Sequence, residues 1–152
     1  MKDISVKALA KINLGLDVVR KREDGYHEVR MVMQTIHLFD RLEISKNTSG
    51  EITMETNLSF LPTNENNLVY KAAKLMKDTF KIDGGFKIHL TKNIPAAAGL
   101  AGGSSDCAAT LIGINELCGL GFDIEKLCES FLITDCCPFY NIAHFLPPLT
   151  AF

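Results

Sequence analysis

An unbroken alternation of apolar and polar residues near the N-terminus constrains the fold of this chain more than any other feature. Every even position from Ile4 to Val18 is apolar, and most of the odd positions between them are polar or charged. Successive side chains of a β-strand point to opposite sides, so a period of two indicates a strand with one buried face. The sequence predicts a strand over 4–18 with a buried apolar face, and it places Lys11 and Asn13 together on the opposite, polar face.

Further extended segments follow this strand. Residues 20–25 are turn formers, and extended character returns over 29–37 and 41–45. Residues 47–50, Asn-Thr-Ser-Gly, are typical of a tight turn, and we expect them to form a hairpin that leads into a strand over 51–55. The first third of the chain is therefore predicted to be almost entirely β.

Helical periodicity begins after a polar loop. Leu68, Ala72, Leu75 and Met76 recur at helical spacing, Asn66 or Asn67 can cap the start, and two glycines follow at 84–85. Residues 86–90 alternate as a short strand that runs into a glycine-rich loop and then into an apolar helix over 107–118. Strands come first and helices are interleaved later, which predicts an α+β fold with helices on one face of the sheet.

The glycine-rich loop spans 92–106 and reads Lys-Asn-Ile-Pro-Ala-Ala-Ala-Gly-Leu-Ala-Gly-Gly-Ser-Ser-Asp. Its glycines Gly99, Gly102 and Gly103 allow positive φ angles and close approach of a ligand, and the following helix presents its positive end. The spacing fits neither the P-loop nor the dinucleotide fingerprint. The loop indicates a cradle for a nucleotide phosphate; the alternative is a flexible connector into an alanine-rich helix.

Composition excludes several classes of protein. Sixteen Lys and Arg are scattered among eighteen Asp and Glu, giving a net charge of −2, so no basic stripe for nucleic acid is present. With 152 residues the chain can build one core without disulfides or a structural metal. The five cysteines lack Cys-x-x-Cys spacing, the histidines lack the spacing of metal ligands, and no long apolar span or targeting segment occurs. We expect a cytoplasmic protein that binds a small molecule and contacts neither membrane nor nucleic acid.

Four stretches occur together in a distinctive order: Ala-Lys-Ile-Asn-Leu at 10–14, Arg-Glu-Asp-Gly-Tyr-His at 22–27, Asn-Asn-Leu at 66–68, and the loop at 94–105. Together they resemble the N-terminal half of the GHMP kinases, over residues 6 to about 128. The resemblance implies the α+β N-terminal domain of that family, a sheet packed against helices with a glycine-rich phosphate loop leading into a helix. It implies ATP as co-substrate, accompanied by Mg²⁺.

The Asp-Gly-Tyr-His segment at 24–27 resembles the cytidine-recognition segment of one branch of this family. It implies transfer of the γ-phosphoryl group of ATP to the 2-hydroxyl of 4-(cytidine 5′-diphospho)-2-C-methyl-D-erythritol, in the non-mevalonate route to isoprenoids and terpenoids. A relative acting on homoserine, galactose or mevalonate is disfavoured, because such enzymes have no evident need for this segment.

The resemblance also implies roles for residues on the acceptor side. Lys11 would lie near the hydroxyl that is phosphorylated and stabilise the developing charge, and Asn13 would hydrogen-bond the substrate. Tyr26 would stack on cytosine and His27 would hydrogen-bond the edge of the base. The alternatives are a solvated strand lysine for Lys11 and ordinary loop residues for Tyr26 and His27.

On the nucleotide side, the resemblance implies that Asn67 and Leu68 lie near the adenine, although a helix N-cap is a competing role for Asn67. Lys92 maps onto an ATP-side position of the family, and Ser104 or Ser105 can add a hydroxyl contact to the phosphates. The full set of predicted nucleotide-binding residues is Asn67, Leu68, Lys92, Pro95, Gly99, Leu100, Ala101, Gly102, Gly103, Ser104 and Ser105.

The resemblance weakens towards the C-terminus. Asp135 is the candidate catalytic base, but the family's Gly-x-Asp-x-Pro-Phe pattern is altered around it, and the alternative is a turn residue. We expect an ATP-binding domain over 1–130 and a diverged tail over 131–152, with the family's C-terminal domain absent because the kinase is truncated or frame-altered. Two functions remain open, the kinase and a non-catalytic nucleotide-binding fragment of it.

Overall fold

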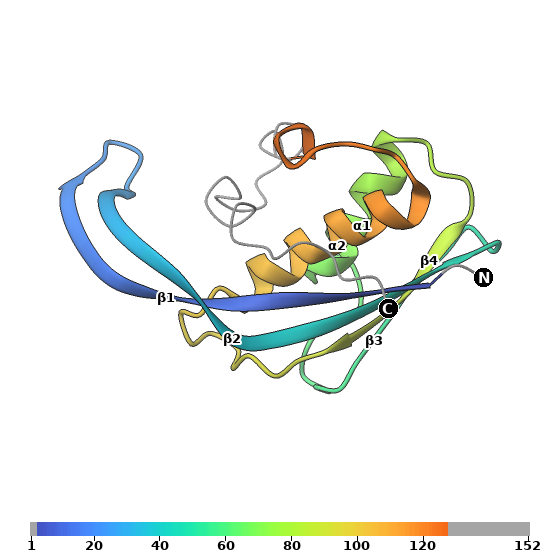
Figure 1. The fold of residues 1–152 in the computed structure, drawn as a ribbon, viewed down its shortest axis with the longest axis horizontal. Helices are drawn as coiled ribbons and strands as arrows, with labels where there is room; N and C mark the ends of the chain where they lie inside the picture. Colours follow the sequence, from blue (N-terminus) through green and yellow to red (C-terminus); the bar gives the residue numbers. More distant parts are fainter. Residues whose placement is uncertain (1–2, 128–152) are drawn as a thin grey trace.

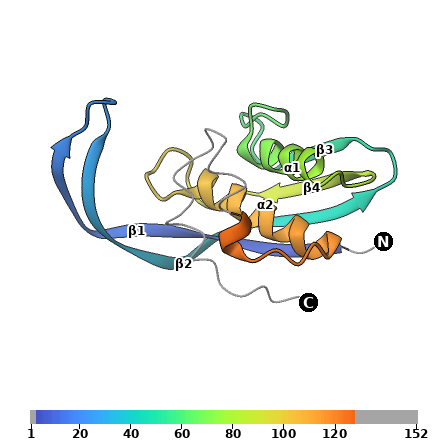
Figure 2. The same ribbon diagram turned by 90° about the horizontal axis from the view of Figure 1, so that it is seen from above.

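The structure is a computed structural model, and it describes residues 3–127. One four-stranded sheet has the spatial order β1-β2-β4-β3 (Figure 1). Its strands are β1 (Asp3–Lys21), β2 (His27–Asn47), β3 (Ile52–Thr56) and β4 (Gly85–Thr91). Helices α1 (Leu68–Thr79) and α2 (Gly102–Cys118) lie side by side on one face of the sheet (Figure 2). The predicted α+β arrangement is confirmed.

The predicted hairpin between β2 and β3 is wrong. The turn at 47–50 forms, with Asn47 Nδ2 donating to Glu51 O and Ser49 N donating to Asn47 Oδ1. However, β4 lies between the two strands, antiparallel to β2 and parallel to β3, and Phe86 N donates to Glu51 O. Turn residues determine where the chain reverses, but they do not determine which strand pairs with the next one. That choice comes from the apolar face of β4, a segment distant in sequence.

The alternation in β1 predicts a single buried face, and this holds only for the first half of the strand. Val6, Ala8 and Ala10 are buried, whereas Leu14 and Val18 are 63% and 59% exposed. From about residue 12 onward, β1 and β2 extend beyond the rest of the sheet as a curved two-stranded arm, which no helix of the described chain covers (Figure 1). The alternation of apolar and polar residues in β1 continues into the arm. The helices that bury the apolar face of the first half of β1 do not cover the arm.

A register irregularity changes the face on which the arm's side chains point. Asn13 pairs with Met33 and Gly15 pairs with Val32, so Leu14 is one extra residue in β1. An extra residue bends a strand and shifts its alternation by one. The even positions beyond Leu14 therefore do not continue the face that Val6, Ala8 and Ala10 form, although the sequence shows no break there.

The core lies between the sheet and the two helices. Among residues 3–127, Phe86 is the largest fully buried side chain, and it lies on β4 with Ile88 and Leu90. Helix α2 comes close to the sheet because of a small residue: a Cβ added at Gly113 would be 2.9 Å from Ile44 Cδ1 and 3.2 Å from Val6 Cγ2. This close approach at Gly113 packs α2 directly on β1 and β2.

Candidate functional site

The loop between β4 and α2 contains positive φ angles, as its sequence predicts, but they do not all occur at the predicted residues. Gly99 has φ of 73°, while Ala97 and Ala101 also take left-handed values of 58° and 61°. Gly102 and Gly103 belong to α2, which begins five residues before the predicted start at 107. Of the three glycines that were expected to allow positive φ angles, Gly99 takes one, whereas Gly102 and Gly103 do not.

Gly102 is required by space rather than by its dihedral angles. A Cβ at this position would lie 3.1 Å from Lys92 Nζ and 3.1 Å from Ile94 Cγ2. The absence of a side chain lets Lys92 approach the first turn of α2. This helix begins at Ala101 without a side-chain cap, so the positive end of α2 faces the loop together with the lysine.

The loop encloses a pocket of about 440 Å³. All the predicted nucleotide-binding residues except Ser105 line it: Asn67, Leu68, Lys92, Pro95, Gly99, Leu100, Ala101, Gly102, Gly103 and Ser104. Ser105 is buried instead, and its Oγ has no hydrogen-bond partner among residues 3–127. The pocket also includes Asp106, the last residue of the predicted loop, together with Leu61 and Pro62, which the sequence did not indicate.

Asn67 is the N-cap of α1, as one of its two predicted roles requires. Its Oδ1 accepts from Val69 N at 2.9 Å, and its Nδ2 donates to Pro62 O at 2.8 Å. The side-chain amide thus fixes the loop at 62–67 against the helix. Leu68, the first residue of α1, lies against Gly103, where an added Cβ would be 3.6 Å from Leu68 Cδ1.

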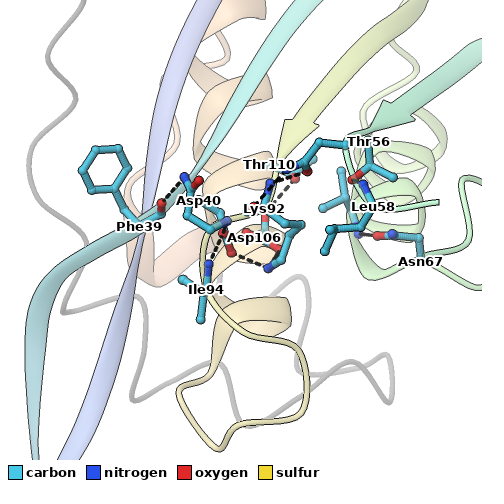
Figure 3. Close-up of polar contacts among 12 residues, drawn as sticks. Phe39, Asp40, Thr56, Leu58, Asn67, Lys92, Ile94, Asp106 and Thr110 are labelled. Carbon is cyan, nitrogen blue, oxygen red and sulfur yellow. Dashed lines mark hydrogen bonds and ion pairs between the residues drawn. The ribbon is translucent and has the colours of Figure 1, made fainter. Parts of the chain in front are cut away.

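A buried ion cluster lies beneath the loop (Figure 3). Lys92 Nζ donates to Asp40 Oδ2 and, at 2.6 Å, to Asp106 Oδ2. Asp40 Oδ1 also accepts from the backbone N–H groups of Asn93 and Ile94, at 2.5 and 2.8 Å. All three charged side chains are at least nine-tenths buried. The cluster ties β2, the end of β4 and the first turn of α2 to one point.

Burial raises the pKa of Asp106 from 3.8 to about 7, because water is excluded from its charged form. The ammonium of Lys92 opposes this shift, and the neighbouring carboxylate of Asp40 adds to it. Asp106 Oδ1 has no hydrogen-bond partner among the described residues. Asp106 therefore exchanges its proton near neutral pH.

A pH dependence of stability follows. Between pH 4 and about 7 the folded chain holds a proton on Asp106 that the unfolded chain has lost, so the contribution of this group to stability falls as pH rises. One proton gives a slope of at most about 1.4 kcal/mol per pH unit. Urea unfolding of the wild type and of Asp106→Asn across this range should show the difference: the wild type should lose stability relative to the variant with rising pH. Parallel profiles would contradict the assignment.

Lys11 connects β1 to the glycine-rich loop. Its Nζ donates to Gly99 O at 3.1 Å and to Asn13 Oδ1 at 3.2 Å. Its backbone N–H donates to Leu100 O at 3.0 Å. The predicted proximity of Lys11 and Asn13 on the polar face of β1 is confirmed, and the structure adds that the lysine rests on the loop.

Tyr26 and His27 lie at the far end of the arm and are not brought next to Lys11. His27 pairs with Lys21, which is eight residues beyond Asn13 on β1, on the order of 26 Å along an extended strand. Tyr26 is 75% exposed. Asp135, the candidate base, lies outside the described residues.

Two further features bear on the class of protein. Among residues 3–127, no three His, Cys, Asp or Glu side chains gather in a way that could hold a metal ion. No helix in the same part of the chain is long and apolar enough to cross a membrane.

Comparison with known proteins agrees with the geometry. A family model of the GHMP kinases N terminal domain matches residues 67–137, which include the loop and α2. A crystal structure of 4-(cytidine 5′-diphospho)-2C-methyl-D-erythritol kinase superimposes with a TM-score of 0.74 at 34% identity, covering 97% of this chain and 55% of that one. The chain carries a GHMP kinase N-terminal domain.

Relatives of this GHMP domain are close in sequence. A 4-diphosphocytidyl-2-C-methyl-D-erythritol kinase of Lachnoclostridium phytofermentans is 62% identical over 124 residues, which are 82% of this chain and 43% of that protein. One of Lachnospira eligens is 56% identical over 127 residues, 84% of this chain and 44% of that protein. A homoserine kinase of Cytophaga hutchinsonii shares the fold, with a TM-score of 0.67 at 20% identity over 86% of this chain and 40% of that one. The chain spans less than half the length of the curated relatives.

Asp40 and Asp106 are the residues of the GHMP domain that sequence reasoning missed. Asp40 did carry a signal: it shares the even register with Leu42 and Ile44, which point into the core. A charged residue on an apolar face needs a buried partner. The sequence alone does not indicate that this partner is Lys92, fifty-two residues later.

Proposed function

We propose that this chain is the nucleotide-binding part of a kinase that transfers the γ-phosphoryl group of ATP to the 2-hydroxyl of 4-(cytidine 5′-diphospho)-2-C-methyl-D-erythritol. The main support is the contact of Lys11 with the glycine-rich loop, since Lys11 Nζ is 3.1 Å from Gly99 O. The predicted acceptor-side lysine and the predicted phosphate loop therefore adjoin each other. The substrate is proposed from the relatives at 62% and 56% identity, which are named 4-diphosphocytidyl-2-C-methyl-D-erythritol kinases.

Phosphoryl transfer depends mainly on positioning and on neutralising charge. In the proposal, the loop and the positive end of α2 hold the phosphates, and Lys92 supplies a fixed cation at the pocket wall. Lys11 stabilises the charge that develops at the attacking hydroxyl, and Asn13 orients the substrate beside it. Leu68 and the backbone at Asn67 form the side of the pocket assigned to the adenine.

Mg²⁺ is proposed to enter as part of the ATP complex, coordinated by phosphate oxygens. The described residues offer no cluster of carboxylates or imidazoles for a separate metal site. When bound, Mg²⁺ would neutralise part of the phosphate charge.

The arm is the proposed site for the cytidine end of the substrate. Tyr26 offers an exposed ring for stacking at its tip, and His27 is adjacent. A single ligand that contacts both Lys11 and Tyr26 requires the arm to curve over it. The arm does curve towards the side of the sheet that carries the helices (Figure 1).

We retain as proposals the domain limits 1–130, the diverged tail 131–152 and Asp135 as base. A cytoplasmic location likewise stays a prediction, as does the absence of contact with nucleic acid. The second candidate function is nucleotide binding without turnover, and it is favoured by the same pocket if Asp135 is not placed to accept the hydroxyl proton.

The deciding experiment is ³¹P NMR of the 152-residue chain with Mg²⁺-ATP and the cytidyl diphosphate substrate. Formation of ADP and of a new phosphomonoester signal would establish the kinase. ATP binding, measured in parallel by calorimetry, without turnover would support the second function. A folded chain that does neither would contradict both.

Removal of the Lys11 side chain should reduce turnover. If the ammonium stabilises the transition state, Lys11→Ala lowers kcat and kcat/KM together by at least about tenfold, which is about 1.4 kcal/mol. Steady-state kinetics would measure both constants, with Lys87→Ala, an exposed lysine on β4, as control. A change confined to the KM for ATP would instead mean that Lys11 only positions the loop through Gly99.

Tyr26→Ala should affect only the cytidyl ligand. Stacking of an aromatic ring on a base contributes about 1–3 kcal/mol, so the affinity for the cytidyl substrate should fall by roughly 5- to 150-fold while ATP affinity stays the same. Calorimetric titration with each ligand separately tests this. Equal weakening of both ligands would remove Tyr26 from the proposed cytidine site.

A further inference from the structure

The three members of the buried cluster are not equally satisfied. Asp40 accepts hydrogen bonds from Lys92 Nζ and from two backbone N–H groups, which engage both of its oxygens. Asp106 accepts only from Lys92, through Oδ2, and its Oδ1 is buried with no partner in the part of the chain that the structure describes. A buried carboxylate oxygen without a donor is costly while the group is ionised. A proton that enters this cluster is therefore expected on Asp106.

The charge of the cluster changes with that proton. Two carboxylates and one ammonium sum to −1 when Asp106 is ionised and to zero when it is protonated. The cluster borders the pocket directly, because both Lys92 and Asp106 line it. An anionic ligand in this pocket therefore lies beside a cluster of charge −1 when Asp106 is ionised, and beside a neutral cluster when Asp106 is protonated.

The charged groups that act on Asp106 come from two elements. They are Asp40 on β2 and Lys92 after β4. Towards the loop, α1 presents the apolar Leu68, and β1 presents Lys11, whose ammonium is bound to Gly99 O and Asn13 Oδ1. The balance between Asp40, Lys92 and Asp106 thus decides the protonation of this site.

We propose that binding of a nucleotide phosphate in the loop pocket is coupled to the uptake of one proton by Asp106, which leaves Lys92 free to pair with Asp40 and with the phosphate. The proton comes from solvent and is added to the carboxylate, and no covalent bond of the ligand changes. The coupling rests on the proposed nucleotide site. It assigns to Asp106 a role in binding that depends on its proton rather than on direct contact with the ligand.

The coupling is reciprocal by thermodynamic linkage. A phosphate favours the protonated cluster, and protonation of Asp106 strengthens phosphate binding. Above the pH at which free Asp106 loses its proton, the affinity of the wild type should fall by up to about tenfold per pH unit. The burial-raised pKa of about 7 places the start of this fall near pH 7.

The test is isothermal titration of the 152-residue chain with Mg²⁺-ATP, at pH 8, in two buffers that differ in ionisation enthalpy. The dependence of the observed heat on the buffer gives the number of protons taken up. Asp106→Asn keeps an acceptor for Lys92 but cannot titrate, and Glu55→Gln, an exposed carboxylate on β3, is the matched control. Protonation of ATP itself is the same in all three titrations and cancels in the comparison.

The wild type and Glu55→Gln should each take up as much as one proton more than Asp106→Asn. The affinity of Asp106→Asn at pH 8 should exceed that of the wild type by up to about tenfold and approach it at pH 6. An infrared difference spectrum of the wild type on addition of ATP gives the same answer without a variant, through a new protonated-carboxyl band. Equal proton uptake in wild type and Asp106→Asn, or no such band, would overturn the coupling while leaving nucleotide binding intact. A wild type that binds no ATP would refute the proposed function and the coupling with it.

Discussion

Lys92→Met is expected to lower the free energy of unfolding by about 3–5 kcal/mol, the usual cost of removing one partner from a buried ion pair. The variant leaves the carboxylates of Asp40 and Asp106 beneath the loop without a cation, and both are almost fully buried. Methionine has a similar length and apolar stem, so the loss reports the missing charge more than a cavity. Urea unfolding at pH 8 would measure it.

The same substitution at Lys87 is the matched control. Lys87 pairs with Glu55 on the surface at 4.0 Å, and exposed pairs of this kind contribute about 0–1 kcal/mol. The loss in Lys92→Met should shrink in mildly acidic solution, because protonation removes the uncompensated charge. A loss below 1 kcal/mol at pH 8 would mean that the two carboxylates do not depend on Lys92.

Phe86→Ala is expected to destabilise the domain by about 3–5 kcal/mol. Phe86 is the largest fully buried side chain, and it lies on β4 between the sheet and the helices. Its removal loses the transfer free energy of the ring and leaves a cavity that a sheet paired on both sides of β4 has little freedom to close. Chemical unfolding at one pH, compared with the wild type, gives the value.

Phe60→Ala provides the comparison for that experiment. Phe60 is 69% exposed, and a substitution at such a position should change stability by no more than about 0.5 kcal/mol. Similar losses in the two variants would contradict the position of Phe86 in the core.

Local patterns predicted the elements of this fold well where the physical cause is local. The N-cap of α1 at Asn67 and the strand leading into the glycine-rich loop depend on neighbouring residues, and both are present. The pairing of β3 with β4 instead of β2 depends on contacts between distant segments, so a turn at 47–50 could not reveal it. The exposed half of β1 was mispredicted for a related reason: alternation shows that one face is apolar, but not whether another layer covers it.

In the candidate site, too, the features with a local cause were predicted, and those that depend on distant segments were not. The loop was recognised because its glycines give the backbone local freedom directly before a helix, and its individual nucleotide-binding residues were predicted from the resemblance to the family. The cluster under the loop was not recognised, because Asp40, Lys92 and Asp106 come from three separate segments. The two left-handed alanines, Ala97 and Ala101, were also unexpected, since glycine is the usual residue there.

The backbone bonds of Asp40 affect the order in which the molecule is assembled. The entry to the loop is held by a carboxylate that precedes it by more than fifty residues, through Asn93 N and Ile94 N. This bond can form only after β2 and β4 have come together, a long-range step that carries a large loop-closure cost. The glycine-rich loop is consequently completed late, and under the proposed function a nucleotide would bind only chains whose sheet has already paired. Such a ligand would slow unfolding far more than it would accelerate folding.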